Sequence, residues 1–375
     1  MTALPDQVEP IQARAAQDNS LATQGAHAAW SPDAPIIQTR AVTGDRHLPP
    51  LFLSGNDHEA LKAGDHPISL TVDGRERQVE IHVPPGYDGS KPIPVMYLMP
   101  GMGGSIAQMK NETGMNRRAD QNGFAVVYVQ ALAKEFPGTL GLEHSPSWNL
   151  DHGSLTDKTA GYDDLNYIKA ADRLVDSSLN VDKNAKYIAG FSEGGGAAQF
   201  IAESMPHTFA GVGSVHGTHL DSDLLPYKDD PTAFIAIHGD NDHMLPLSGG
   251  RGFMTVLVSR AAQSEPAVQP GIWARAEGDS QVSISDDGKD KITTYSGGSA
   301  PVEMIIRHGG EHAWDGLGQN PKDGKPTYGW YVVGEPDATE SSSTDLVKGL
   351  MSFRKDGSHA DPNRNFLTGD EVVVH

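Results

Sequence analysis

The serine at position 192 lies in a pattern that can make it a nucleophile. It is the central residue of Gly190–Gly194, whose sequence GFSEG has the form Gly-x-Ser-x-Gly. A β-prone run at 186–190 leads into the pattern, and a run with helical character at 195–205 follows it. A sharp turn between a strand and a helix strains the serine backbone and exposes its hydroxyl, while glycines let the two elements approach closely. The pattern therefore predicts a nucleophile elbow at Ser192.

Two further residues are of the types that a serine nucleophile needs, namely a base that takes its proton and a carboxylate that orients the base. His312 follows two glycines at the end of a predicted strand, and Asp242 lies in the loop after another predicted strand. The order serine, aspartate, histidine is that of the α/β-hydrolase fold. We therefore predict a catalytic triad of Ser192, Asp242 and His312. Asp240 is the alternative acid, and His308 is the alternative base.

Backbone amides are the expected donors to the oxyanion that forms during acyl transfer. One donor is the amide of Glu193, which follows the nucleophile at a predicted helix N-terminus, where the helix dipole favours negative charge. The other is expected from the glycine-rich loop 100–104, at the amide of Met102. A phosphate-binding role for this loop is set aside, because it lacks the Lys-Ser/Thr ending of a P-loop. Trp148 and Trp314 lie in loops near the site and are candidates for walls of a substrate pocket, although packing alone would also explain them.

The rest of the chain predicts strands that alternate with helices. Strands are expected at 94–99, 124–130, 186–190, 209–215, 232–237 and 302–307. Helices are expected at 106–121, 161–179, 195–205, 252–263 and 343–354. A hairpin over 69–83 and a β-ribbon over 272–295 complete the pattern. Such alternation predicts an α/β fold, with a mostly parallel sheet flanked by helices and joined by right-handed crossovers. The candidate residues all follow strand ends, so we expect them together at the carboxyl edge of the sheet.

The ends of the chain differ in composition from its middle. Residues 1–65 are rich in Ala, Gln, Asp and Pro with little periodicity, which predicts a mostly disordered leader. Residues 66–358 are expected to form the catalytic domain, and 359–375 a C-terminal tail. The loop over 131–161 is long enough to favour a functional role. The start of the chain has no pattern of a Sec signal peptide, and no apolar run is long enough to span a bilayer. These features leave the localisation open between the cytoplasm and export by a non-classical route.

Composition excludes several classes of partner and cofactor. The formal net charge is −20, which disfavours binding to nucleic acid and to anionic membranes. No cysteine is present, so disulfides, thiolate catalysis and Cys-ligated zinc are excluded. The segment 361–371 resembles a calcium loop, but Phe366 replaces the required glycine and Val372 the final glutamate. We expect no cofactor and no metal, and an ester as the partner, either a small molecule or a polymer.

Several segments in the same order carry a resemblance to a known family. They lie at 83–89, 101–105, 147–149, 163–164, 190–194, 238–242, 294–298, 309–314 and 337–340. From about Ser69 to Lys355 the chain resembles the esterases of the polyhydroxybutyrate depolymerase and feruloyl esterase group, the LpqC-like α/β-hydrolases. The resemblance places the nucleophile of the family on Ser192, its acid on Asp242 and its base on His312.

The chain departs from this family at several positions. Pro100 stands where relatives often have histidine, and Met102, Ser147 and Ser296 stand where they often have cysteines. Glu193 replaces a commoner neutral residue after the nucleophile, and its carboxylate could disfavour acidic acyl groups.

The leading hypothesis is a serine carboxylic-ester hydrolase that forms an acyl-enzyme on Ser192. Its substrate would be a feruloyl or other aryl ester, a sugar-linked ester or a polyhydroxyalkanoate-type ester. One alternative is a serine peptidase of the same fold, which is disfavoured because the propeller domain common in such peptidases is missing. The other is a catalytically silent binding protein, against which the presence of all three triad residue types argues.

Overall fold

The computed structural model places most of the chain after residue 60. It describes residues 39–41, 61–135, 144–150, 162–218, 226, 229–250, 252, 265–316, 336–337, 339 and 341–372. The chain divides into two units, Met1–Ile36 and Ile37–His375. All described residues belong to the second unit, and the architecture below refers to it alone.

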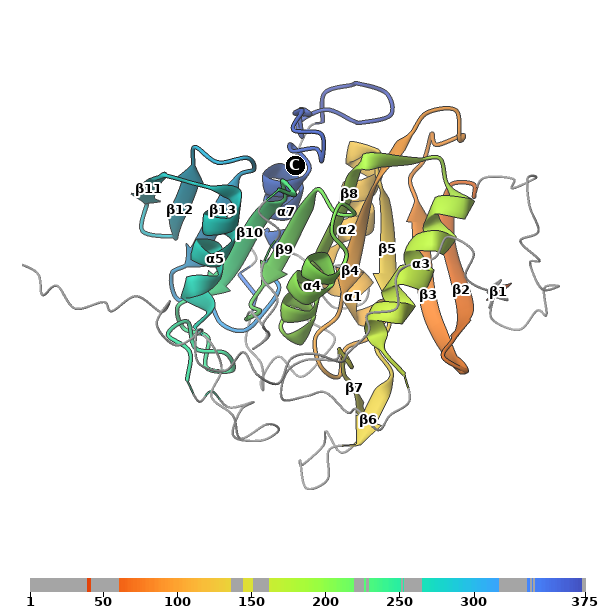
Figure 1. The fold of residues 1–375 in the computed structure, drawn as a ribbon, viewed down its shortest axis with the longest axis horizontal. Coiled ribbons are helices and arrows are strands. Elements are labelled where there is room, and N and C mark those ends of the chain that lie inside the picture. The colour runs from red at the N-terminus through yellow and green to blue at the C-terminus, as the bar shows by residue number, and fades with distance from the viewer. Residues whose placement is uncertain are drawn as a thin grey trace, which may run out of the picture. The chain divides into compact units, whose positions relative to one another are not determined.

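The second unit is built on an eleven-stranded sheet (Figure 1). Its strand order is β1-β2-β3-β5-β4-β8-β9-β10-β13-β12-β11. The strands are β1 (Thr39–Ala41), β2 (Gly64–Val72), β3 (Arg75–Val83), β4 (Ile93–Met99), β5 (Ala125–Val129), β8 (Val181–Phe191), β9 (Gly211–Val215), β10 (Ala233–Gly239), β11 (Gln281–Asp286), β12 (Asp290–Ser296) and β13 (Val302–Arg307). The central run from β5 to β13 is parallel, and antiparallel strands extend it at both edges. Two short strands, β6 (Ala133–Glu135) and β7 (His144–Pro146), pair separately.

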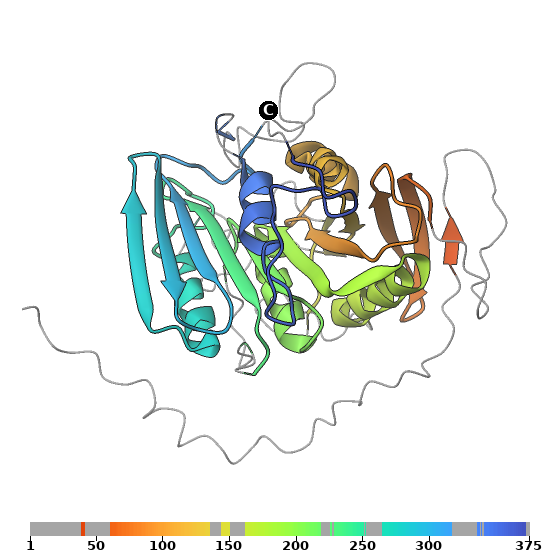
Figure 2. The same ribbon diagram turned by 90° about the horizontal axis from the view of Figure 1, so that it is seen from above.

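Helices cover both faces of the sheet, as Figure 2 shows from above. They are α1 (Ile106–Thr113), α2 (Met115–Asn122), α3 (Asp164–Ser178), α4 (Glu193–Ser204), α5 (Gln269–Glu277) and α7 (Ser342–Leu350), with a short 3-10 turn, η3, at Pro266–Val268. Buried residues of α3, α4 and α5 share one hydrophobic cluster, and those of α1, α2 and α7 share the other. This arrangement is the mostly parallel sheet flanked by helices that the alternation of strands and helices predicted.

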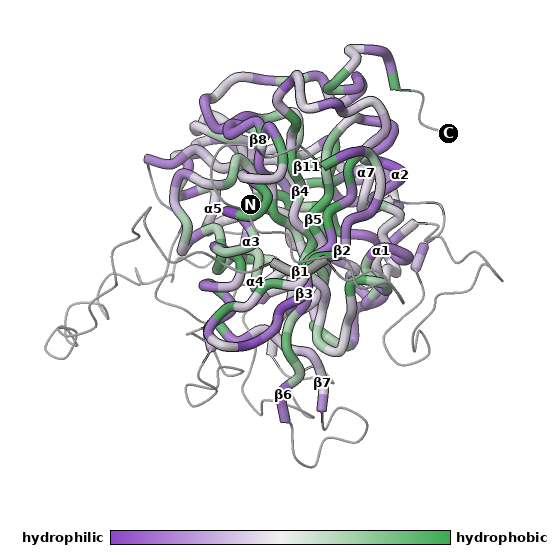
Figure 3. The backbone as a smooth tube through the Cα atoms, turned by 90° about the vertical axis from the view of Figure 1, so that its right-hand side faces the viewer, coloured by the Kyte–Doolittle hydropathy of each residue, from purple (hydrophilic) through white to green (hydrophobic). Residues whose placement is uncertain are grey.

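The central strands are buried because helices exclude water from both of their faces. Every residue of β4, β5, β9 and β10 is buried. Hydrophobic segments accordingly gather along the middle of the molecule, and hydrophilic ones lie at its periphery (Figure 3). The sheet thus gives the loops at its carboxyl edge a rigid base.

Two predicted elements were wrong in detail. The single helix expected at 106–121 is broken into α1 and α2 at Gly114, whose φ of 57° ends the first helix in the left-handed region. The ribbon expected at 272–295 begins later, because α5 occupies its first part and ends at Gly278. Trp273 stacks on Phe234 of the sheet with ring centroids 5.0 Å apart, so tertiary packing outweighs the local β propensity. The helix expected at 252–263 lies outside the described residues, apart from Gly252.

The structure describes little of the predicted leader, residues 1–65, and most of the predicted C-terminal tail, residues 359–375. Strand β1 lies within the predicted leader and pairs with β2, and the remaining residues before 61 lie outside the described part, so their predicted disorder stays a prediction. Residues 359–372 lie against α2, where Asn365 donates to the carbonyl of Gln121 at 2.9 Å and Phe366 donates its amide to the carbonyl of Asn122 at 2.6 Å. In the described part of the chain, no helix is long and apolar enough to cross a bilayer.

Candidate functional site

Ser192 lies at the turn between β8 and α4. Its φ of 54° and ψ of −122° are a strained conformation for a residue with a side chain. A Cβ atom on Gly190 would lie 2.1 Å from the carbonyl oxygen of Gly194, and one on Gly194 would lie 2.2 Å from the carbonyl oxygen of Met99. Both glycines are therefore needed for the close crossing of strand and helix. The predicted context of strand, sharp turn and helix is present.

His312 bridges the other two residues of the predicted triad. Its Nε2 atom lies 2.9 Å from Oγ of Ser192, and its Nδ1 atom lies 2.7 Å from Oδ2 of Asp242. His312 is 120 positions from Ser192 and 70 positions from Asp242 in the chain, and the sheet brings the three residues together at its carboxyl edge. The arrangement lets Ser192 donate its hydroxyl proton to His312 while His312 donates to the carboxylate.

Asp242 is fixed by donors on both of its oxygens. Oδ1 accepts the amides of Met244 and Leu245 at 2.9 and 2.8 Å. Oδ2 accepts from His312 and also from Nδ1 of His216 at 2.8 Å. Burial alone would raise the pKa of Asp242, but the charge of His312 and the hydrogen bonds from His216 and His312 outweigh it and hold the pKa well below its usual value. The carboxylate therefore stays ionised at any pH at which the protein works.

The imidazole of His312 is 3% exposed. Burial lowers its pKa below the usual value, and the neighbouring Asp242 only partly opposes this shift. The ring also packs against Phe191, with centroids 5.0 Å apart. A neutral His312 is the form that can accept a proton, so the environment keeps it ready to act as a base.

The two alternatives from the sequence, Asp240 and His308, lie together at the surface. Nδ1 of His308 lies 2.8 Å from Oδ2 of Asp240, and the amide of Gly309 donates to the other oxygen at 2.7 Å. Nε2 of His308 faces Asp286 at 3.3 Å. Among the described residues, neither side chain forms a hydrogen bond to the triad. The pair instead links the loop after β10 to the loop after β13.

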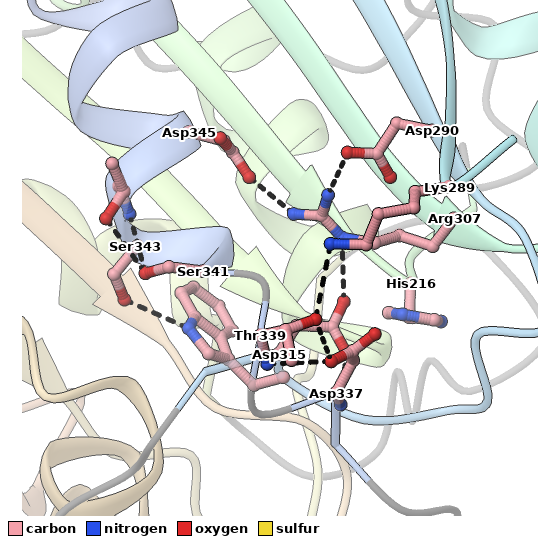
Figure 4. A network of polar contacts seen from close by, with 12 residues as sticks. His216, Lys289, Asp290, Arg307, Asp315, Asp337, Thr339, Ser341, Ser343 and Asp345 are labelled. Carbon is pink, nitrogen blue, oxygen red and sulfur yellow. Dashed lines mark hydrogen bonds and ion pairs between the residues drawn. The ribbon is translucent and has the colours of Figure 1, made fainter. Parts of the chain in front are cut away.

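A buried ion-pair network holds both ends of the His312 loop (Figure 4). Arg307, at the end of β13, donates to Asp315 at 3.0 Å and to Asp290 at 2.7 Å, and also binds Asp345 of α7. Since Arg307 precedes His312 and Asp315 follows it, the network fixes the loop on both sides of the imidazole. Multiple charged hydrogen bonds of this kind fix geometry more strongly than isolated ones.

The glycine-rich loop 100–104 lies beside the nucleophile. A Cβ atom on Gly101 would lie 3.1 Å from Cβ of Ser192. The amide of Glu193 is at the first position of α4, where backbone amides have no partner within the helix. The amide of Met102 donates none of the backbone hydrogen bonds found in the described part of the chain. The two amides that the sequence offered as oxyanion donors thus lie on adjoining segments.

The Glu193 side chain points into the protein. Its Oε1 atom accepts the hydroxyl of Ser147 at 2.6 Å, and its Oε2 atom is buried without a hydrogen-bond partner. Burial raises the pKa of Glu193 to about 7, although Ser147, Lys134 and the amide of Trp148 favour ionisation. The expectation that this carboxylate acts on the acyl group of the substrate stays a prediction, and the buried position points to a structural contact.

The two tryptophans near the site are packed and hydrogen bonded. Trp148 is 3% exposed and donates its indole N–H to the carbonyl of Pro100 at 2.8 Å. Trp314 is 5% exposed and donates to Oγ of Ser343 at 3.0 Å. They offer a substrate little surface, and their predicted role as pocket walls stays a prediction.

The sequence analysis missed His216 and His238. His216 follows β9, and His238 lies near the end of the neighbouring strand β10. Their place at strand ends was the signal that could have identified them. With Asp242 they form a buried group whose potential ligand atoms lie within 4.8 Å of one another. Nε2 of His238 lies 2.8 Å from the carbonyl oxygen of Leu245, which can only accept, so this nitrogen carries a proton. Nδ1 of His216 faces the ionised Asp242 and is also a donor. Nδ1 of His216 and Nε2 of His238 thus donate to oxygen atoms, whereas Nε2 of His216 is buried without a hydrogen-bond partner among the described residues.

Comparison with known proteins agrees with this geometry. The family model described as “Putative esterase” matches residues 70–283, more than half of the chain. The chain belongs to this esterase family. It is 26% identical over 311 residues to “Putative esterase NocK” of Nocardia uniformis subsp. tsuyamanensis, covering 75% of this chain and 81% of that protein.

A second relative is Feruloyl esterase C of Emericella nidulans, which is 28% identical over 246 residues, covering 64% of this chain and 77% of that protein. Probable feruloyl esterase C of Aspergillus clavatus is 32% identical over 150 residues, covering 40% and 50%. With the family shown and the fold that of an α/β-hydrolase, the esterase is a serine carboxylic-ester hydrolase.

Proposed function

We propose that the esterase hydrolyses its substrate through an acyl-enzyme on Ser192, with His312 as the base and Asp242 as the residue that orients it. The observation that carries this proposal is the position of the His312 imidazole, 2.9 Å from Oγ of Ser192 and 2.7 Å from Oδ2 of Asp242. Both distances are within hydrogen-bond range, and the buried ring is held in one orientation.

The reaction then has two halves. As Oγ of Ser192 attacks the ester carbonyl carbon, Nε2 of His312 takes the hydroxyl proton, and Asp242 stabilises the imidazolium. The amides of Glu193 and Met102 donate to the oxygen that becomes negative. The imidazolium then gives its proton to the leaving alcohol oxygen as the ester C–O bond breaks. Water then attacks the acyl carbon while Nε2 of His312 takes one of its protons, and the imidazolium returns that proton to Oγ of Ser192 as the bond between the acyl carbon and Oγ breaks, which releases the acid and free Ser192.

We propose an aryl ester of the feruloyl type as the substrate class. Support comes from the feruloyl esterases among the relatives, such as that of Emericella nidulans, which is matched over 77% of its own length. A sugar-linked ester without the aryl group and a hydroxyalkanoate ester are the competing classes. A panel of esters that vary only in the acyl group, compared by kcat/KM, distinguishes them, and a preference for hydroxybutyrate esters would contradict the aryl assignment.

The acyl-enzyme can be tested with a fluorophosphonate, which serine hydrolases attack with loss of fluoride. We expect one adduct by intact mass, located on Ser192 by peptide mapping, and no adduct on Ser192→Ala or after heat denaturation. Ser90→Ala, a change at an exposed serine, is the matched control and should label like the original protein. A wild-type protein that hydrolyses esters but labels elsewhere would overturn the assignment of Ser192. A protein that neither labels nor hydrolyses any ester would be the silent binding protein considered above.

A further inference from the structure

We propose that the segment 146–149 positions the two oxyanion donors relative to each other, and that it does so on the Glu193 side through the hydrogen bond between Ser147 and the Glu193 carboxyl group. Ser147, Trp148 and Glu193 are then positioning residues. This inference rests on the proposed function, because it assumes that the amides of Glu193 and Met102 bind the oxyanion.

The segment 146–149 holds the loop of Met102 at two points. The carbonyl of Pro146 accepts the amide of Gly103 at 2.7 Å. The indole of Trp148 donates to the carbonyl of Pro100 at 2.8 Å. These bonds lie on either side of Met102, so they fix the direction in which its amide points.

The same segment holds the nucleophile turn. Oγ of Ser147 lies 2.6 Å from Oε1 of Glu193, the residue whose amide is the other donor. Glu193 and Ser147 are 46 positions apart in the chain, so the contact depends on the folded sheet. One short segment therefore contacts both donor-bearing elements, and its displacement would separate the two amides.

The segment is itself anchored to a rigid part of the molecule. Lys134 donates to the carbonyl of Trp148 at 2.5 Å, and the amide of Asn149 donates to Asp164 at 2.5 Å. Asp164 is buried and paired with Arg77 of β3. These contacts connect the segment to β3, β6 and α3, which gives it a fixed frame from which to position the donors.

The charge of Glu193 matters because its own amide faces the developing oxyanion. Ser147 and the amide of Trp148 lie against the carboxyl group from the segment 146–149, the cation of Lys134 faces it from β6, and the carboxylate of Asp164 faces it from α3. A negative charge on Glu193 would oppose the formation of a second negative charge close by, whereas the neutral acid would not. With burial raising the pKa of Glu193 to about 7, the carboxyl group loses its proton near neutrality. Activity should therefore fall on the alkaline side of that value.

The first test separates positioning from substrate binding. Ser147→Ala and Trp148→Phe each remove one hydrogen bond while keeping most of the side-chain volume. We expect kcat for a chromogenic aryl ester to fall roughly tenfold in each, below the 10²–10³-fold cost of losing an oxyanion donor outright, with KM little changed. Ser145→Ala, a buried serine two residues earlier in β7, is the matched control and should keep kcat. A raised KM with unchanged kcat in Trp148→Phe would overturn the inference in favour of direct substrate contact.

The second test uses the pH profile of Glu193→Gln, whose amide is neutral at every pH and can still accept from Ser147. We expect the fall of kcat/KM above neutral pH in the original protein to disappear in this variant. The same alkaline fall in both proteins would overturn the role of the neutral carboxyl group. Thermal unfolding of each variant shows whether it is folded. If Glu193→Gln does not fold, the pH profile of Ser147→Ala is measured in its place. Fluorophosphonate labelling distinguishes failure of the proposed function from failure of this inference. An unlabelled Ser192 contradicts the proposed function. Normal labelling together with a normal kcat in Ser147→Ala contradicts this inference alone.

Discussion

The Nδ1 atom of His216 lies 2.8 Å from the Oδ2 atom of Asp242. That oxygen also accepts from His312, so the carboxylate of the proposed triad is shared by two histidines. The second donor holds Asp242 in place and stabilises its charge, and both effects change how strongly Asp242 can support a positive charge on His312.

Replacement of His216 by phenylalanine should therefore shift the acid side of the pH profile. The pKa of His312 is lowered first by burial and in part by His216. Removing His216 leaves Asp242 with more of its charge directed at His312, so the pKa of His312 rises. Because the neutral base is the active form, kcat/KM should then begin to fall at a higher pH than in the original protein. Loss of the hydrogen bond should also lower the plateau by roughly tenfold.

The measurement is kcat/KM between pH 4 and 9 for one soluble ester. His308→Phe is the matched control, because His308 is paired with the exposed Asp240 and lies outside the triad. We expect its profile to coincide with that of the original protein. An unshifted or lowered acid limb in His216→Phe would contradict the proposed effect of His216 on the base.

The two aspartates of the His238–Asp242 loop should differ sharply in their effect on activity. Asp242→Asn removes the charge that orients His312, which in the general serine-hydrolase template costs on the order of 10⁴-fold in kcat. Its acid limb should also move to lower pH, since the imidazolium loses its carboxylate. Asp240→Asn affects the surface contacts with His308 and Gly309, and activity should stay within about twofold of the original. If Asp240→Asn proved to be the inactive variant, the assignment of the acid would be wrong.

Some residues of the site have a local pattern in the sequence that predicts their position, and others do not. Ser192, Asp242 and His312 could be predicted because each follows a strand end and the glycines around Ser192 have a steric reason that shows in the sequence. The break at Gly114 was missed because a glycine within a periodic helical pattern is compatible with either one helix or two.

His216 and Glu193 depended on contacts that no local pattern encodes. Glu193 meets Ser147 across 46 positions, and His216 meets Asp242 across 26. A glutamate after the nucleophile is expected to be exposed from its type alone, whereas the folded residue is half-buried, bonded to Ser147 and has a buried Oε2 atom. In the same way, Trp273 of α5 was assigned to a ribbon because its partner Phe234 lies on a distant strand.

Gly190→Ala should destabilise the fold as well as the active site. An added Cβ would lie 2.1 Å from the carbonyl oxygen of Gly194, and neither backbone segment can move without displacing Ser192. We expect the free energy of unfolding to fall by about 3 kcal/mol, at the upper end for overpacking, with esterase activity lost. Gly288→Ala is the control, since its φ of 85° is strained for alanine but nothing lies within 4 Å of the added atom. It should cost about 1–2 kcal/mol and leave activity unchanged, as measured by urea unfolding. Equal stabilities of the two variants would contradict the close crossing at the nucleophile turn.

The start of the catalytic domain can be tested by truncation. The sequence placed this boundary near residue 66, but Asp65 binds His82 at 2.6 Å and Lys110 at 2.8 Å. The amide of Leu61 also donates to the carbonyl of Ser178 at 3.1 Å. A chain that starts at residue 61 should keep its specific activity, and one that starts at residue 66 should have a lower melting temperature. Loss of soluble, active protein from the longer of the two would show that residues before 61 are needed for folding.

Chelation should leave the esterase active. Among the described residues, the group of His216, His238 and Asp242 is the one whose atoms lie close enough to hold a metal ion, and its nitrogen atoms facing Asp242 carry protons. An ion there would compete with His312 for the carboxylate, so added zinc should inhibit the enzyme if it binds at all. The measurement is ester hydrolysis after dialysis against EDTA and after stepwise addition of zinc, with His238→Gln as the comparison. Activity that disappears with EDTA and returns with zinc would contradict the serine mechanism, because Ser192 and His312 supply the nucleophile and the base without a metal.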